Sequence, residues 1–270
     1  MEDCKIISWN VNGLRSPSMN LLTKEKPKKF NLESNLSKLL DIEDPDIICL
    51  CETKCQSKNE VELNSYIPFE YKIWNSSTEK LGYSGVCVWS KIPFKNMGQI
   101  EGLENDNQGR YLFLDFNMFY LINVYVPNTG GDKDKYRKNI WNPSIYNLLE
   151  KLKFENKPVI FCGDLNVVRD FKDIYNPEIL KKGKSPGVKE YERNDFQKLL
   201  DLGYLDCMRY IDNNSNYWTW WDPRSKAREK DNGWRLDYFL ISNGDLIKNS
   251  KIHKDIYGSD HCPISLEITF

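Results

Sequence analysis

The sequence lacks any apolar run long enough to cross a bilayer, since its longest candidates are short segments such as DIICLC and PVIFC. Its N-terminal stretch, MEDCKIISWN, has neither the basic start nor the long apolar core of a signal peptide. Basic charge is not in excess either, because the net charge is −1. We therefore expect a globular protein with no membrane partner, whose contacts with nucleic acid, if it makes any, depend on local basic patches.

Histidine is scarce, with two among 270 residues, and cysteine has no pattern typical of a zinc site. Cys49, Cys51 and Cys55 have the wrong spacing and no neighbouring histidine. Several of the eight cysteines stand inside apolar segments, where thiols behave as small core residues. Without a signal peptide, this pattern predicts an intracellular, reducing compartment, either nucleus or cytoplasm.

What the sequence does contain is a series of short apolar segments separated by turns. They are rich in β-branched and aromatic residues, which is typical of strands. The predicted strands are KIISW, DIICLC, GVCVW, YLFLDF, FYLINVYV, PVIFCG, YWTWW, LDYFLI and ISLEI. Many strands and few helices predict two packed sheets flanked by helices, and we expect each half of the chain to supply one sheet.

Helical periodicity occurs in three places. The apolar positions are Leu32, Leu36, Leu39 and Leu40, then Ile145, Leu148, Leu149 and Leu152, and finally Phe196, Leu199, Leu200 and Leu202. Asn142-Pro143 reads as the cap and first residue of the second helix, and Gly203 as the stop of the third.

Polar residues recur where the predicted strands end. Such residues often only stabilise turns, but their recurrence at so many strand ends favours a shared site. They are Asn10, Asn12, Glu52, Lys54, Tyr125, Asn128, Asp164, Asn166, Asp237, Asp260 and His261.

These side chains combine into a recognisable chemistry. Glu52, Asp260 and an asparagine amide offer hard oxygen ligands, which suit Mg²⁺. Asp164, with an asparagine two residues later, can position and deprotonate a water molecule. His261 can donate a hydrogen bond to an oxyanion if a buried carboxylate such as Asp237 orients it. A cation, a water-activating base and several donors are what phosphodiester hydrolysis requires.

The motifs that hold these residues resemble, in order, those of the exonuclease III-type apurinic/apyrimidinic (AP) endonucleases of the endonuclease/exonuclease/phosphatase superfamily. The resemblance covers about residues 4–270, so we expect one catalytic domain over residues 1–270. It also implies the fold of that superfamily, a four-layer α/β sandwich with two central sheets. The motifs are ISWNVNGLR, LCETKC, VYVPN, GDLNV, GWRLDYFL and GSDHCPI.

The resemblance implies a role for each site residue. Asp164 is the implied base, with Asn166 beside it, and His261, paired with Asp237, is the implied phosphate contact. Tyr125 is implied to touch the phosphate or the leaving group. The implied metal-side residues are Asn10, Asn12, Glu52 and Asp260.

The activity implied is Mg²⁺-dependent hydrolysis, with Mn²⁺ as a substitute, on the 5′ side of an abasic site in double-stranded DNA. It leaves a 3′-hydroxyl and a 5′-deoxyribose phosphate. The same enzymes also clean blocked 3′ ends or act as 3′→5′ exonucleases. We expect such an enzyme to work as a monomer.

A small apolar pocket would accept an abasic sugar and exclude an intact nucleotide. The resemblance implies that Trp234 and Leu236 line it together with an aromatic residue of YWTWW. We expect Trp218 to form that wall, with Trp220 as the alternative. Lys54 and two basic loops would hold the DNA backbone without reading its sequence. The residues of these two loops are Lys181, Lys182, Lys184, Arg224, Lys226, Arg228 and Lys230, and a third basic segment holds Lys24, Lys26, Lys28 and Lys29.

Two features depart from the family pattern. The lysine-rich loop over residues 16–31 is longer than usual and either adds a DNA contact or is only a mobile loop. Gly131 stands where some relatives insert an arginine into DNA.

Other readings of the sequence remain open. Inositol polyphosphate 5-phosphatases share the WNVNG-like start but need a Trp-Cys-Asp-Arg run near the end. Retrotransposon-type endonucleases usually adjoin a polymerase domain. A catalytically dead DNA-binding module would lack one of the catalytic residues.

Overall fold

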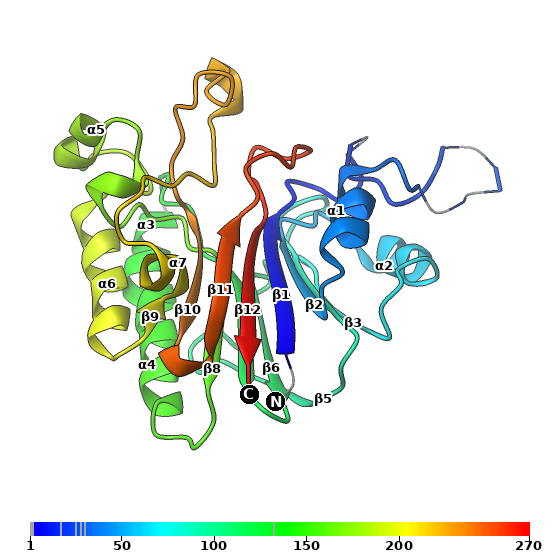
Figure 1. The fold of residues 1–270 in the computed structure, drawn as a ribbon, viewed down its shortest axis with the longest axis horizontal. Helices are drawn as coiled ribbons and strands as arrows, with labels where there is room; N and C mark the ends of the chain where they lie inside the picture. The colour runs from blue at the N-terminus through cyan, green and yellow to red at the C-terminus, as the bar shows by residue number, and fades with distance from the viewer. Residues whose placement is uncertain (1–2, 17, 25, 28, 30, 132) are drawn as a thin grey trace.

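Two six-stranded sheets face each other, with helices on their outer faces (Figure 1). The structure, a computed structural model, describes residues 3–16, 18–24, 26–27, 29, 31–131 and 133–270. This arrangement confirms the four-layer α/β sandwich predicted from the sequence. Within the described residues, no helix combines the length and the apolar character that crossing a bilayer requires.

The first sheet combines both ends of the chain. Its strands, in spatial order, are β11 (Ile247–Ile252), β12 (Ile264–Thr269), β1 (Asp3–Asn10), β2 (Ile47–Cys51), β4 (Val86–Ser90) and β3 (Tyr71–Asn75). Only β1 and β2 are parallel. The expectation that each half of the chain supplies one sheet is therefore wrong, because β11 and β12 return to pair beside β1.

The second sheet comes from the middle of the chain. Its strands, in spatial order, are β5 (Phe94–Gly98), β6 (Tyr111–Phe116), β7 (Tyr120–Tyr125), β8 (Val159–Asp164), β10 (Asp237–Ile241) and β9 (Leu205–Asp206). Here β7 and β8 form the parallel pair. Both sheets thus carry one parallel pair near the centre, whose strands end at the same edge.

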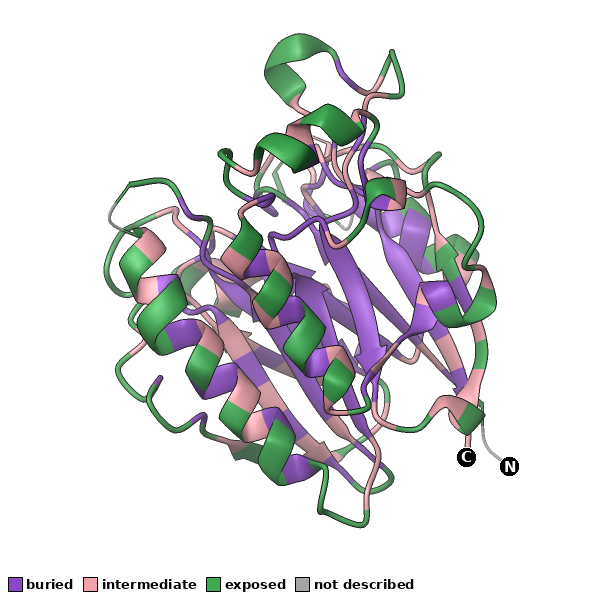
Figure 2. Cartoon of the chain, turned by 90° about the vertical axis from the view of Figure 1, so that its left-hand side faces the viewer, coloured by how far each residue is buried: buried purple, intermediate pink, exposed green. Residues whose placement is uncertain are grey.

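Side chains of the central strands alternate between two cores. Along β2, Ile47, Cys49 and Cys51 pack between the sheets, whereas Ile48 and Leu50 pack under the helices. Burial on both faces explains why such strands read as continuous apolar runs (Figure 2). All eight cysteines are buried free thiols.

The helices cover the outer faces as the periodicity predicts, with small shifts of boundary. Leu32 is exposed because the first helix begins only after Ser34, whose hydroxyl accepts a hydrogen bond from the Ser37 amide. Asn142 is not a cap: the preceding π-helical turn η1 (Arg137–Trp141) runs directly into the second predicted helix. Gly203 follows the third, with φ +101°. The α-helices are α1 (Asn35–Glu43), α2 (Ser57–Asn64), α3 (Lys133–Tyr136), α4 (Asn142–Leu152), α5 (Pro177–Lys182), α6 (Glu190–Asp201) and α7 (Cys207–Ile211).

Several turns after the strands require unusual backbone. Asn12, Glu52 and Asn166 have left-handed φ values of 46°, 52° and 47°. Gly163 has φ +128°, and a Cβ there would lie 2.0 Å from the Val124 carbonyl oxygen. Glycine therefore lets β7 and β8 pair closely just before Asp164.

The aromatic run YWTWW does not form the strand that its composition predicts. Within it, only Trp220 makes isolated bridges, to Trp234 and His261. Its tryptophans fill space between loops at the site edge, and this packing replaces a regular ladder.

Candidate active site

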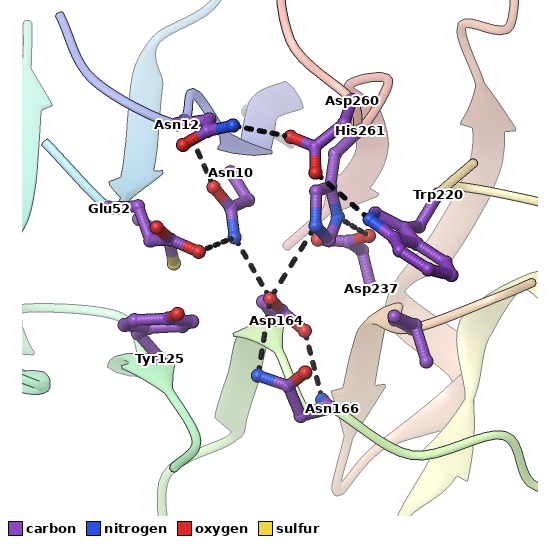
Figure 3. A network of polar contacts seen from close by, with 12 residues as sticks. Asn10, Asn12, Glu52, Tyr125, Asp164, Asn166, Trp220, Asp237, Asp260 and His261 are labelled. Atoms are coloured by element: carbon purple, nitrogen blue, oxygen red, sulfur yellow. Dashed lines mark hydrogen bonds and ion pairs between the residues drawn. The ribbon is translucent and has the colours of Figure 1, made fainter. Parts of the chain in front are cut away.

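The polar residues at the strand ends meet in one network, which links the edges of the two sheets (Figure 3). Asn10, at the end of β1, lies at its centre. Its amide nitrogen donates to Glu52 Oε1 at 3.1 Å and to Asp164 Oδ2 at 2.9 Å. Its Oδ1 accepts from the Asn12 backbone amide at 3.1 Å. Asn10 thus joins an oxygen-rich side of the site to the carboxylate of β8.

The oxygen-rich side also holds Asp260. Asn12 Nδ2 donates to Asp260 Oδ1 at 3.0 Å, and Trp220 Nε1 donates to Asp260 Oδ2 at 3.0 Å. Burial works against ionisation of Asp260, but the His261 charge and the Trp220 hydrogen bond hold its pKa below the usual value. Asp260 is therefore an anion at neutral pH.

Glu52 is also held ionised. Burial alone would raise its pKa, but a hydrogen bond from Tyr125, the Lys54 charge and the Asn10 amide lower it. The Lys54 ammonium lies 3.2 Å from Glu52 Oε2 and also donates to Asn12 Oδ1. Lys54 thus lies within the site, where a cation is stabilised by Glu52 and Asn12.

This donor set fits a hard divalent cation. Asn10, Asn12, Glu52 and Asp260 offer amide and carboxylate oxygens, which suit Mg²⁺ or Mn²⁺. The ammonium of Lys54 shows that the site already accommodates positive charge. Two observations thus support a divalent metal here: the oxygen ligands themselves and the Lys54 ammonium that lies among them.

Asp164 is the buried carboxylate of the site, with 1% of its surface exposed. Its Oδ1 accepts from the Asn166 backbone amide at 2.9 Å, and Asn166 Nδ2 donates to the Val126 carbonyl at 2.8 Å. Burial raises the pKa of Asp164 to about 7, although the nearby His261 charge opposes the shift. A carboxylate with such a pKa can take up a proton near neutral pH.

His261 is oriented by a buried partner. Its Nδ1 lies 2.8 Å from Asp237 Oδ2, which also accepts a hydrogen bond from the Thr219 hydroxyl at 2.6 Å. Burial disfavours the charged ring, but the Asp237 and Asp164 carboxylates outweigh it and raise the His261 pKa to about 10. The ring is therefore a protonated donor, and its Nε2 lies 3.8 Å from Asp164 Oδ2.

Asp164, Asp237 and His261 also form a group with possible metal-ligand atoms within 4.8 Å of one another. The hydrogen bond between Asp237 Oδ2 and His261 Nδ1 already uses two of the candidate ligand atoms, and a protonated imidazole has no free lone pair. The geometry favours a hydrogen-bonded chain here and a cation among the oxygens around Glu52.

Tyr125, at the end of β7, faces Glu52 and Asp164. Burial is the main cause that raises its pKa, followed by these two carboxylates, so the phenol stays protonated. The Arg110 guanidinium lies 4.7 Å from the Tyr125 ring centroid and donates to the Tyr125 carbonyl at 3.2 Å. Tyr125 is thus a neutral hydrogen-bond donor whose position is held by Arg110.

An apolar wall adjoins the network. Trp220 and Trp234 pack edge to face with ring centroids 5.5 Å apart, in a cluster that includes Leu236. Trp218 packs instead with Trp221, in a separate cluster. Trp220, the alternative for this wall, therefore faces Trp234, whereas Trp218, the residue expected to form it, belongs to the other cluster.

The predicted basic loops differ in what they offer. Arg224 and Lys226 are exposed on the light-orange loop that projects above the sheet edge in Figure 1, around the 3-10 turn η3 (Pro223–Ser225). Arg228 is engaged internally: it donates to the Lys254, Ile256 and Ser259 carbonyls and lies over Trp221 and Tyr257.

Other predicted basic positions lie at the end of α5 and among residues 24–29. Lys181 and Lys182 end α5 and are exposed, as are Lys24, Lys26 and Lys29. Lys28 lies outside the described residues. Gly131 has φ +66°, and a Cβ added there would meet no atom within 4 Å among the residues that the structure describes.

Two supporting residues were missed from the sequence. The Thr219 hydroxyl donates a hydrogen bond to Asp237. Thr219 lies inside an aromatic run, and its polar side chain is the one feature there that could have indicated a role in the site. Arg110 supports Tyr125 but follows a glycine in a loop with no motif of its own.

Comparison with known proteins agrees with this geometry. A model of the Endonuclease/Exonuclease/phosphatase family matches residues 7–261. The chain is 36% identical to an exodeoxyribonuclease of Bacillus subtilis, over 98% of this chain and 99% of that protein. It is 38% identical to the DNA repair nuclease APEX1 of Danio rerio, over 97% of this chain and 81% of that protein.

Solved structures show the same fold. A 3′-5′ exonuclease from Neisseria meningitidis superposes with a TM-score of 0.82 at 24% identity, over 98% of this chain and 100% of that one. An AP endonuclease from Leishmania major superposes with a TM-score of 0.80 at 25% identity, over 99% and 88% respectively.

Proposed function

The chain belongs to the endonuclease/exonuclease/phosphatase family, and we propose that it is a DNA-repair AP endonuclease. It would cleave the phosphodiester on the 5′ side of an abasic site, leaving a 3′-hydroxyl and a 5′-deoxyribose phosphate. The observation that carries this proposal is the pairing of Asp164 with a His261 held by Asp237, directly beside the oxygen ligands linked by Asn10.

In the proposed reaction Asp164 takes the proton of the attacking water. Asn166 fixes the carboxylate through its backbone amide, and its side chain is held against Val126. His261, kept protonated by Asp237, donates to a non-bridging oxygen of the phosphate. Tyr125 donates to the phosphate or the leaving oxygen. These fixed donors meet the negative charge that develops during hydrolysis.

A Mg²⁺ or Mn²⁺ ion held by Asn10, Asn12, Glu52 and Asp260 would supply positive charge at the scissile phosphate. The ion would replace the Lys54 ammonium as the partner of Glu52 and Asn12. Lys54 would then be free to contact the DNA backbone. Arg224 and Lys226 would hold the duplex from the projecting loop without reading its sequence.

Selectivity would come from the wall of Trp220, Trp234 and Leu236. An abasic sugar fits against such a wall, whereas an intact nucleotide brings a base that must be unstacked and accommodated. The same chemistry acts on a blocked 3′ end, so 3′-phosphodiesterase and 3′→5′ exonuclease activities are proposed as well.

The direct test is incision of a duplex oligonucleotide with one tetrahydrofuran abasic mimic. We expect cleavage on the 5′ side in Mg²⁺ or Mn²⁺, complete loss in EDTA, and recovery when Mg²⁺ is restored. The matched duplex without the lesion is the control. No incision of the lesion duplex, together with phosphate release from inositol polyphosphates, would favour a different phosphoesterase of the family.

The pH dependence follows from the two titrating groups. Asp164 must be deprotonated, so the rate rises as pH increases through its pKa of about 7. His261 must be protonated, so the rate falls as pH rises toward its pKa of about 10. A bound cation lowers both pKa values, which moves the bell-shaped profile to lower pH. Single-turnover rates across pH would check it, and a rate that is flat between pH values of about 5 and 10 would contradict it.

A further inference from the structure

Arg137 lies outside the network of Figure 3 but reaches the backbone behind it. It is the first residue of η1, the π-helical turn between α3 and α4, and only 2% of its surface is exposed. Neither DNA nor a cation could touch so buried a side chain. Its contacts must therefore act through other parts of the protein.

The guanidinium joins the two chain segments that carry Tyr125, Asp164 and Asn166. Nη1 donates to the Asn166 carbonyl at 2.9 Å and to the Pro127 carbonyl at 3.3 Å. Nη2 donates to the Leu165 carbonyl at 3.0 Å. One planar group thus satisfies three carbonyls, from the turn after β7 and the turn after β8.

These carbonyls have no strand ladder to pair with, because the turn after β8 is irregular. Asn166 has a left-handed φ of 47°, a conformation that asparagine adopts more readily than most residues but that neighbouring contacts must still hold. That same conformation directs the Asn166 amide to Asp164 Oδ1. The Asn166 backbone amide is therefore bonded to Asp164 in the site, and the carbonyls of the same turn are bonded to Arg137 on the opposite side.

The charge of Arg137 is balanced within the same layer. Glu192 of α6 lies 3.3 Å from Nη1, and its side chain is fully buried. Glu192 is itself fixed by the Thr129 hydroxyl and by the Lys189 amide. The guanidinium is thus held rigidly, and its planar fork matches a set of carbonyls that a lysine cannot serve at once.

We propose that Arg137 is a positioning residue that sets the left-handed turn at Asn166 and, through it, the placement of the Asp164 carboxylate. This inference rests on the proposed hydrolytic function of the site. It predicts that Arg137 affects the chemical step and not the binding of DNA, because its partners are backbone carbonyls behind the site and the buried Glu192 carboxylate.

The test is incision of the tetrahydrofuran duplex by Arg137→Lys and Arg137→Gln, with kcat and KM taken from steady-state rates and the chemical step checked by single turnover. Arg137→Lys keeps the ion pair with Glu192 but loses the fork, so its kcat should fall roughly tenfold while KM stays within about twofold. Arg137→Gln should lose about a hundredfold, so that lysine partly rescues the rate.

Leu149→Ala is the matched control, since Leu149 is a fully buried residue of α4 in the same core. It should lower the melting temperature at least as much as Arg137→Lys and leave kcat within about threefold, because it shifts no polar contact of the turn. A kcat for Arg137→Lys within twofold of the wild-type value would overturn the inference, as would an equal loss in Leu149→Ala. Failure of the wild-type protein to incise would instead overturn the proposed function.

Discussion

Asp164→Asn is expected to lower kcat by about a thousandfold or more while DNA binding is kept. The substitution removes the carboxylate that takes the proton from water, and the buried site has room for an amide of the same shape. Asp164 contacts Asn10, Asn166 and His261, not the exposed loops, so affinity for the duplex should change little. Single-turnover incision would give the rate, and fluorescence anisotropy on the tetrahydrofuran duplex would give the affinity.

The melting temperatures of the variant and the wild type show whether a lower rate reflects loss of structure. The melting temperature of Asp164→Asn should stay near the wild-type value, because the raised pKa shows that burial disfavours the charge which the substitution removes. Turnover close to wild type would remove Asp164 from the role of base. Lost binding together with lost turnover would place it instead among the residues that hold the substrate.

His261→Ala is expected to cost a comparable factor, about a thousandfold in kcat. The variant loses the protonated donor that faces the phosphate. It also leaves the buried Asp237 carboxylate without its histidine partner, although the Thr219 hydroxyl still donates to it. The falling limb of the pH profile should vanish, since its titrating group is gone. Rates measured from neutral to alkaline pH would show this directly.

Asp237→Asn is the informative companion to that variant. The Asp237 charge is the largest of the favourable influences on the His261 pKa, so its removal should move the falling limb to lower pH. A profile that keeps its alkaline limb in His261→Ala would show that another group titrates there. An unchanged limb in Asp237→Asn would separate Asp237 from the charge state of the histidine.

The sequence determined the type of fold and the composition of the site. Apolar runs such as PVIFC are continuous because β8 is buried on both faces, so the strand prediction follows from local pattern alone. Weakly patterned strands were not predicted: β5 is mostly exposed and β9 has two residues. The polar residues at strand ends were found because each lies next to an apolar run, either after it, as Asp164 does, or before it, as Asp237 and His261 do.

Only the tertiary structure decided which side chains share a neighbourhood. Trp218 and Trp220 are two residues apart and equally aromatic, yet only Trp220 packs on Trp234 and bonds to Asp260. Arg228 sits in a basic run, but its guanidinium binds carbonyls of residues 254–259. Such choices depend on how the chain turns between elements, and residue type alone does not specify that path.

The same reasoning applies to the site itself. The sequence alone indicates that Asp164, Asp237 and His261 stand at the ends of strands, where their side chains can reach a substrate. His261 contacts Asp237, 24 positions away in the sequence, and Asn10 contacts Asp164, 154 positions away. Both contacts follow only from the pairing of strands into two sheets whose edges meet at the site. The support from Arg137 was undetectable in sequence for the same reason: its partners are backbone carbonyls, which every residue carries and only the folded turn exposes to it.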